Sequence, residues 1–181
     1  MHAAQQVSSP PLIRELATAC IRYVQEAIRV ELDYSAETLP ILDHYLDHCR
    51  GLLLNDTQSN QRDDILTLVI PATGAYFGEV IRSIYPATHW HMAQEEYANY
   101  RLEFEPFVLT FNPLGAALEA MHRSHMDGWG AHFQLAHKDA DLATRALDQL
   151  GGVRAEDFFR LTLRFEVLQQ LVEALTPTGL N

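Results

Sequence analysis

The chain begins with two stretches in which apolar residues recur every three to four positions. The first predicts a helix over 11–31, and the second predicts a helix that opens near Ser35 or Thr38 and pairs antiparallel with the first. A third apolar run covers 64–85, where Pro71 is expected to kink or restart the helix because its ring does not fit a regular helix interior. The first half of the chain is therefore expected to be helical.

The period changes to two in the middle of the chain, which is typical of strands with one buried face. The apolar members of this alternation are Trp90, Met92, Tyr100, Leu102, Phe104, Phe107, Leu109 and Phe111. Polar residues occupy most of the positions between them. The pattern predicts a three-stranded antiparallel meander over 88–112.

Helical signals return after this sheet. Asn112 before Pro113 is a capping residue followed by a residue with a preset φ, and Ser9 before two prolines gives the same signal at the first helix. A short helix is expected over 139–150 and a long terminal helix over 155–175.

The order of these elements predicts a single α+β domain that spans 1–181. N-terminal helices precede the sheet at 88–112, and C-terminal helices follow it over 113–175. Residues 1–10 are expected to form a disordered N-terminal tail. The sequence has no internal repeat and no linker-like stretch that would mark a domain boundary.

Gly74 and Gly78 stand four residues apart in the third apolar run, so one face of that helix has almost no side chains. A glycine within a helix costs roughly 1 kcal/mol relative to alanine, and close packing against another backbone is the structural explanation. The small-residue helix after Pro113 is expected to pack there, and a ligand lying across the glycines is the alternative. Glu79 and Arg82 interrupt the run, so it is not expected to span a membrane.

Composition restricts the classes of partner. The 181 residues carry 24 acidic side chains against 13 Lys and Arg, a formal net charge of −11, which argues against binding to nucleic acid or to anionic membranes. No secretory signal is visible at the start of the chain, and the cytoplasm is the expected location. Cys20 and Cys49 form no CxxC motif and are expected to be buried thiols.

The 9 histidines are a natural source of metal ligands because neutral imidazole is the commonest one. His44 and His48 stand four apart, a spacing that lets two side chains on one helix face share a metal ion. However, Tyr45 stands where an HExxH metalloprotease has its glutamate, and the neighbours Asp43 and Asp47 favour a solvated face.

A second group of candidate ligands surrounds a glycine-punctuated loop: His122, His125, Asp127, His132 and His137. Three or four of these could converge on one divalent ion, since a catalytic zinc site needs about three protein ligands and an open position. Their spacing matches no established motif, and a polar loop that caps the preceding helix is the alternative.

His89 and His91 flank Trp90 on one predicted strand and so share the face opposite the tryptophan. They are surface groups if that face is exposed and a candidate site if another element covers it.

Charged residues within apolar helices need partners. Glu79 follows a glycine on an otherwise apolar helix, and Arg82 is its expected partner in a structural ion pair, with a general-base role for Glu79 as the alternative. Arg160 and Arg164 stand four apart on the terminal helix with acidic neighbours, which is typical of a solvated or bridging face.

Several catalytic motifs are absent from the sequence. It contains no GxGxxG, no GxxxxGK[ST] and no GxSxG, so ordinary nucleotide enzymes and serine hydrolases are unsupported.

Three segments resemble a family of uncharacterised bacterial proteins: GAYFGEVIRSIYPATHW, YRLEFEPFVLTFNPLGAALEAM and DFFRLTLRFEVLQQLVEAL. In that family a GAYFGEV-like helix precedes a tryptophan and a short sheet. The resemblance covers residues 64–175 and implies an α+β fold in the bacterial cytosol. It carries no known catalytic residues.

Two hypotheses about function follow. The favoured one is a non-catalytic acidic interaction or regulatory module, immunity-like or adaptor-like, that binds a basic protein; it is based on the net charge of −11 and the absent motifs. The other is a metal-dependent hydrolase that uses the histidines near 122–137 together with one of the histidine pairs. A small-ligand pocket between the sheet and the glycine-containing helix fits either class. An apolar helix face left uncovered would indicate a homodimer.

Overall fold

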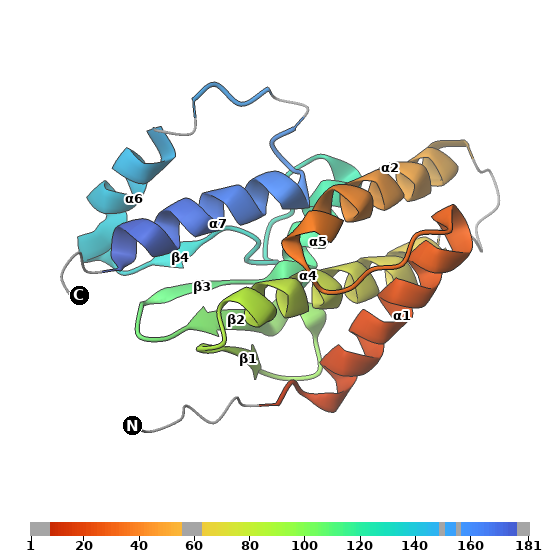
Figure 1. Cartoon of the computed structure of the whole chain (residues 1–181), viewed down its shortest axis with the longest axis horizontal. Helices are drawn as coiled ribbons and strands as arrows, with labels where there is room; N and C mark the ends of the chain where they lie inside the picture. Colours follow the sequence, from red (N-terminus) through yellow and green to blue (C-terminus); the bar gives the residue numbers. More distant parts are fainter. Residues whose placement is uncertain (1–7, 56–62, 149–150, 155–156, 177–181) are drawn as a thin grey trace.

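The chain folds into helices and one small antiparallel sheet, as Figure 1 shows for the computed structural model. The structure describes residues 8–55, 63–148, 151–154 and 157–176, so most of the predicted N-terminal tail lies outside the described residues. The helices are α1 (Pro11–Ile28), α2 (Leu39–Asn55), α4 (Ile70–Ile84), α5 (Pro113–His122), α6 (Ala140–Asp148) and α7 (Leu161–Leu175). The strands are β1 (Thr88–Met92), β2 (Tyr100–Phe104), β3 (Leu109–Phe111) and β4 (Gln134–Leu135). The predicted α+β class is confirmed.

The sheet has four strands in the order β1-β2-β3-β4, each antiparallel to its neighbour. Trp90 pairs with Leu102, and Leu102 pairs with Phe111, so the buried side chains of the three predicted strands share one face. The meander is therefore present, and β4 is an edge strand that the prediction lacked, with Leu135 opposite Leu109. Because β4 has only two residues, it leaves no alternating pattern in the sequence.

Helix α4 is the central helix of the fold, and both α1 and α5 pack along it (Figure 1). A π-helical turn over Ile65–Val69 precedes α4, and the N–H of Ile70 donates to the carbonyl of Ile65. Pro71 accounts for the wider turn, because proline lacks an N–H and its ring crowds the carbonyl four residues earlier in a regular helix. The restart that the sequence predicts at Pro71 takes this form.

The segment Ile65–Ile84 is long and apolar enough to cross a membrane, but 72% of its most apolar 18-residue stretch is buried inside the protein. It is thus a core helix. Cys20 and Cys49 are free and buried in the same core, as expected, and burial raises the pKa of the Cys20 thiol to about 12.

The glycine face of α4 is closed by a backbone and a tryptophan. A Cβ at Gly74 would lie well under 3.0 Å from the backbone of Leu114 at the start of α5, and a Cβ at Gly78 would overlap the ring of Trp90. Asn112 fixes the start of α5 by accepting the N–H of Leu114 at 3.0 Å. The expected packing of α5 on this face is confirmed, and these groups fill the space that a ligand across the glycines would need.

Helix α1 departs from its prediction at both ends. Pro10 holds the N-cap position, and the hydroxyl of Ser9 donates instead to the Glu79 carboxylate, so Ser9 is not the helix cap. The helix ends at Ile28 because Arg29 adopts a left-handed conformation with φ 61°. Its main contact is with α4, and the predicted pairing with α2 is a minor one.

Helix α7 begins at Leu161, and not at residue 155, because a carboxylate from α2 caps it there. Asp43 accepts the N–H of Leu161 at 2.8 Å and the N–H of Thr162 at 3.1 Å. Burial raises the pKa of the Asp43 carboxyl, and the hydrogen bonds from Thr162 and Leu161 offset part of that effect. The predicted helix start at 155–156 lies outside the described residues.

Candidate functional site

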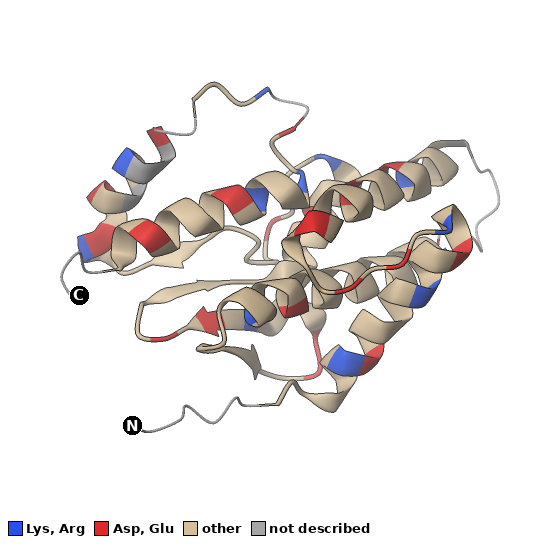
Figure 2. Ribbon diagram, viewed as in Figure 1, with Lys and Arg blue, Asp and Glu red and all other residues tan. Residues whose placement is uncertain are grey.

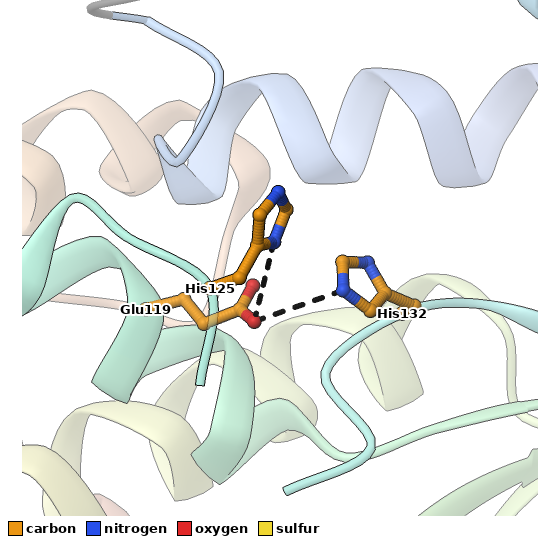
Figure 3. A group of neighbouring side chains, drawn as sticks. All are labelled: Glu119, His125 and His132. Carbon is orange, nitrogen blue, oxygen red and sulfur yellow. Dashed lines mark ion pairs between the residues drawn. The ribbon is translucent and has the colours of Figure 1, made fainter. Parts of the chain in front are cut away.

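A carboxylate and two imidazoles meet where the loop after α5 returns to the sheet. Oε1 of Glu119 lies 3.6 Å from Nδ1 of His125 and 3.8 Å from Nε2 of His132. Figure 3 shows both rings directed at this one carboxylate oxygen. The candidate ligand atoms all lie within 4.8 Å of one another, and among the residues that the structure describes this is the one group of three with such a spacing. We call these three residues the Glu-His-His cluster.

Two donors hold the carboxylate of Glu119, whose side chain is 1% exposed. Arg164 of α7 forms an ion pair with Oε2 through Nη2, and the N–H of Met126 donates to Oε1 at 3.0 Å. Burial lowers the pKa of the Arg164 guanidinium, and the charge of Glu119 opposes that effect. A buried carboxylate requires partners of this kind because an isolated buried charge is strongly unfavourable. Glu119 is therefore held in one orientation, with Oε1 near both histidines.

Aromatic side chains position the two imidazoles. The ring of His125 packs against Phe159 at 5.1 Å between centroids, and His132 is followed by Phe133, whose ring packs on Phe111 of β3 at 4.7 Å. The two imidazole rings lie 5.0 Å apart. Their side chains are 55% and 62% exposed, so solvent and solutes reach both of them.

The loop that carries the histidines is fixed mainly by its backbone. Gly128 and Gly130 have φ values of 82° and 59°, a region that glycine enters without steric cost. The carbonyl of Gly130 accepts the N–H of Asn112 at 2.8 Å, and the carbonyl of Ala131 accepts Nη1 of Arg164 at 2.8 Å. Arg164 thus binds both Glu119 and the loop, so the cluster geometry depends on one buried guanidinium.

Hydrogen bonding does not account for the convergence of the cluster. An N–H···O bond spans about 2.7–3.2 Å, and both histidine nitrogens lie farther than that from Glu119. Zinc ligands lie about 2.0–2.2 Å from the ion, so two ligands of a tetrahedral ion are roughly 3.4 Å apart. The two separations from Glu119, 3.6 and 3.8 Å, differ from that value by a few tenths of an ångström, and the two histidine nitrogens lie within 4.8 Å of each other. Small rotations of the exposed imidazoles can bring all three ligand atoms to a common ion. The three residues therefore fit a divalent transition metal.

An apolar groove of about 710 Å³ lies beside the cluster. His132 and Arg164 line it next to the cluster, and Val167 and Leu171 line it farther along α7. Phe158 also lines the groove and packs against His125 at 5.7 Å between ring centroids. Any molecule in this groove would therefore lie against residues that hold or belong to the cluster.

The structure brings together two of the four loop histidines that the sequence singles out. His125 and His132 belong to the cluster. His122 is exposed at the end of α5, and His137 is exposed in the short helical turn before α6, where it lines the groove. Asp127 is exposed at the loop tip and is not part of the cluster.

The other histidine pairs lie elsewhere. His44 and His48 are exposed on α2 and are not part of the described group of three. His89 lies 3.2 Å from a carboxylate oxygen of Glu103 on the neighbouring strand, and His91 is exposed. Both pairs therefore lie where the alternative interpretation placed them, as surface groups.

Glu79 and Arg82 form the structural ion pair that the sequence predicts, at 3.3 Å. Nε1 of Trp90 donates to Oε1 of Glu79 at 2.8 Å, and the Ser9 hydroxyl donates to Oε2. Both carboxylate oxygens therefore have donors within the fold, which favours a structural role for Glu79 over a general-base role.

Of the two alternatives for the face of the terminal helix, solvated or bridging, Arg164 is not solvated: it is buried and bridges to Glu119 of α5. Arg160 is exposed, and its Nε pairs with Asp157 at 2.7 Å. The sequence interpretation missed Glu119. The usable signal was a lone carboxylate in the apolar segment LGAALEAM, the same signal that identified Glu79.

Comparison with models of known families, with curated proteins and with solved structures found no match. The resemblance to uncharacterised bacterial proteins stays a prediction.

Proposed function

We propose that the chain binds one divalent transition-metal ion, zinc in the first instance, through the Glu-His-His cluster and acts as a metal-dependent hydrolase. The observation that carries this proposal is the convergence of two exposed imidazoles on one oxygen of a buried, immobilised carboxylate. Two histidines and one glutamate are a donor set used by catalytic zinc sites, which keep a fourth position open for water or substrate.

The three cluster residues would bind the ion, and neighbouring groups hold them in orientation. His125 and His132 supply nitrogen ligands at the solvent-facing side, and Glu119 supplies an oxygen ligand from the buried side. Arg164 and the N–H of Met126 hold the carboxylate, the kind of support that outer groups give to metal ligands. A bound zinc ion would polarise a substrate carbonyl and lower the pKa of a coordinated water to about 7.

The acidic interaction module stays the second candidate, and the net charge of −11 is the observation that favours it. Figure 2 shows acidic residues spread over several helices and loops, with basic residues among them. A spread of this kind favours general repulsion of anions over one defined docking surface for a basic protein. The proposal retains a bacterial cytoplasmic setting.

Metal titration with a competing chromophoric chelator tests the metal site. Wild-type protein purified without a histidine tag is expected to bind one zinc ion per chain, and H125A/H132A is expected to bind it roughly a hundredfold or more weakly because two of three ligands are gone. The matched control is H44A/H48A, which removes two exposed histidines from α2 and should bind zinc like the wild type.

Hydrolysis of chromogenic acyl esters by the zinc-loaded protein tests the reaction class. Turnover is expected to depend on zinc and to disappear in H125A/H132A while H44A/H48A retains it. Zinc binding that H125A/H132A retains would contradict the metal site, and stoichiometric binding without any zinc-dependent ester or amide hydrolysis would contradict the hydrolase.

A further inference from the structure

The groove beside the Glu-His-His cluster differs in charge from the chain as a whole. The chain has 24 acidic residues against 13 Lys and Arg, but none of the described residues that line the groove is acidic. The ionisable residues that do line it are Arg164, His132 and His137. This region therefore suits an anionic group in a protein whose overall charge repels anions.

Arg164 has donor capacity beyond its contacts with the fold. Its two terminal nitrogens bond to Glu119 and to the carbonyl of Ala131. Its Nε is buried and has no acceptor in the described part of the chain. A buried donor without an acceptor is unfavourable, and Arg164 lines the groove at this end.

The rest of the groove is mainly apolar. Along α7 it is lined by Leu163, which adjoins Arg164, and by Val167 and Leu171, about one and two turns beyond Arg164. Leu171 lies seven residues after Arg164, which is roughly 10 Å along the helix axis. Leu135 of β4 and Thr144 of α6 form other parts of the wall. The volume of about 710 Å³ is within the range of sites for small organic ligands.

We propose that the groove binds the linear apolar chain of a medium-chain carboxylate, with its head group at the Glu-His-His cluster. The proposal rests on the proposed function for the role of the head group, since such a carboxylate is the product expected when an acyl ester or amide is hydrolysed there. The chain-binding part rests on the groove alone, because its apolar walls extend away from the cluster along α7.

Isothermal titration of a series of linear carboxylates, from hexanoate to tetradecanoate and below their micelle concentrations, tests the inference on metal-free and zinc-loaded protein. Each added methylene is expected to tighten binding roughly fourfold, the factor that corresponds to about 0.8 kcal/mol per buried CH₂. The gain should stop when the chain reaches the end of the groove. Zinc is expected to tighten binding of every member of the series.

Two variants locate the binding. Thr144 is exposed, lines the groove and donates to the carbonyl of Ala140 in its own helix, so T144F should obstruct the groove and weaken the longer chains at least tenfold. Its control is T18F, because Thr18 is an exposed helical threonine with the same bond to Arg14. V167E places a negative charge in the groove and should also weaken binding, with V108E as the control at a valine outside it.

The outcomes separate this inference from the proposed function. Affinity that does not change with chain length, or that is equal in T144F and T18F, would overturn the groove assignment. Zinc binding at the cluster without carboxylate binding would overturn this inference and leave the metal site intact. Chain-length-dependent binding in a protein that binds no zinc would support the groove and overturn the metal site.

Discussion

Glu119 and Glu79 occupy similar positions, each a lone carboxylate within an apolar helix, but their oxygens have different partners. The oxygens of Glu79 accept from Ser9 and Trp90, and Arg82 lies 3.3 Å away. Glu119 pairs with Arg164 and accepts one backbone N–H, and its Oε1 also faces His125 and His132 beyond hydrogen-bond distance. The spacing around Glu119 is that of a candidate metal site, whereas the donors around Glu79 already satisfy both of its oxygens.

The Glu119–Arg164 pair gives a prediction about stability. E119Q keeps the shape of the side chain but leaves the buried guanidinium of Arg164 without its counter-charge. Breaking a buried pair from one side costs about 3–5 kcal/mol, and a loss of that size is expected in the free energy of unfolding of the metal-free protein, measured by urea denaturation.

The control for this experiment is E166Q, which changes an exposed glutamate on α7, the helix that carries Arg164. It should alter stability by less than about 0.5 kcal/mol. If E119Q and E166Q had the same midpoint and slope in urea, the charge pair would contribute nothing to the fold, and its role in holding the cluster would have to be abandoned.

Helix α4 determines how the elements around it are placed. Its glycines let the start of α5 and the ring of Trp90 approach to backbone contact. α5 in turn carries Glu119. The N–H of its cap residue Asn112 donates to the carbonyl of Gly130 in the histidine-bearing loop. The position of the cluster relative to the sheet therefore depends on a helix contact that lies outside the cluster.

Substitution of the glycines tests this contact. A Cβ at Gly74 would collide with the backbone of Leu114, which cannot rotate away, so G74A should lower the free energy of unfolding by about 1–3 kcal/mol. Gly51 on α2 has no atom within 4 Å of an added Cβ, and G51A should raise stability by up to about 1 kcal/mol through helix propensity. Chemical denaturation of both variants measures the two effects, and equal stability of G74A and wild type would show that the helices do not pack as described.

At the scale of the whole molecule, the features with a local signal could be predicted. Periodicity identified the helices and three strands, and the glycine spacing identified the face where α5 packs. β4 was missed because two residues carry no period, and the pair of Glu119 and Arg164 was missed because it joins residues 45 positions apart. The histidines near 122–137 were identified as candidate ligands, but their local spacing could not show which of them converge, since that depends on the return of the loop to α7 and β3.

The cluster lies where α5, its following loop and α7 meet, and α7 runs from there beside β4 towards α6 (Figure 1). The residues that line the groove come from α7, β4 and α6 and from the loops beside them. Segments that are distant in the sequence therefore build one continuous site, with a charged interior, an exposed pair of imidazoles and an apolar extension. This arrangement is typical of a site that orients a substrate at a reactive centre.

X-ray absorption at the zinc K edge, on wild-type protein loaded with one equivalent of zinc, tests the metal site most directly. We expect nitrogen and oxygen neighbours at about 2.0–2.1 Å with the outer-shell scattering of two imidazoles, and loss of one imidazole contribution in H132A. A spectrum that is unchanged in H132A, or one that matches hydrated zinc in the wild type, would contradict the assignment of Glu119, His125 and His132 as a metal site.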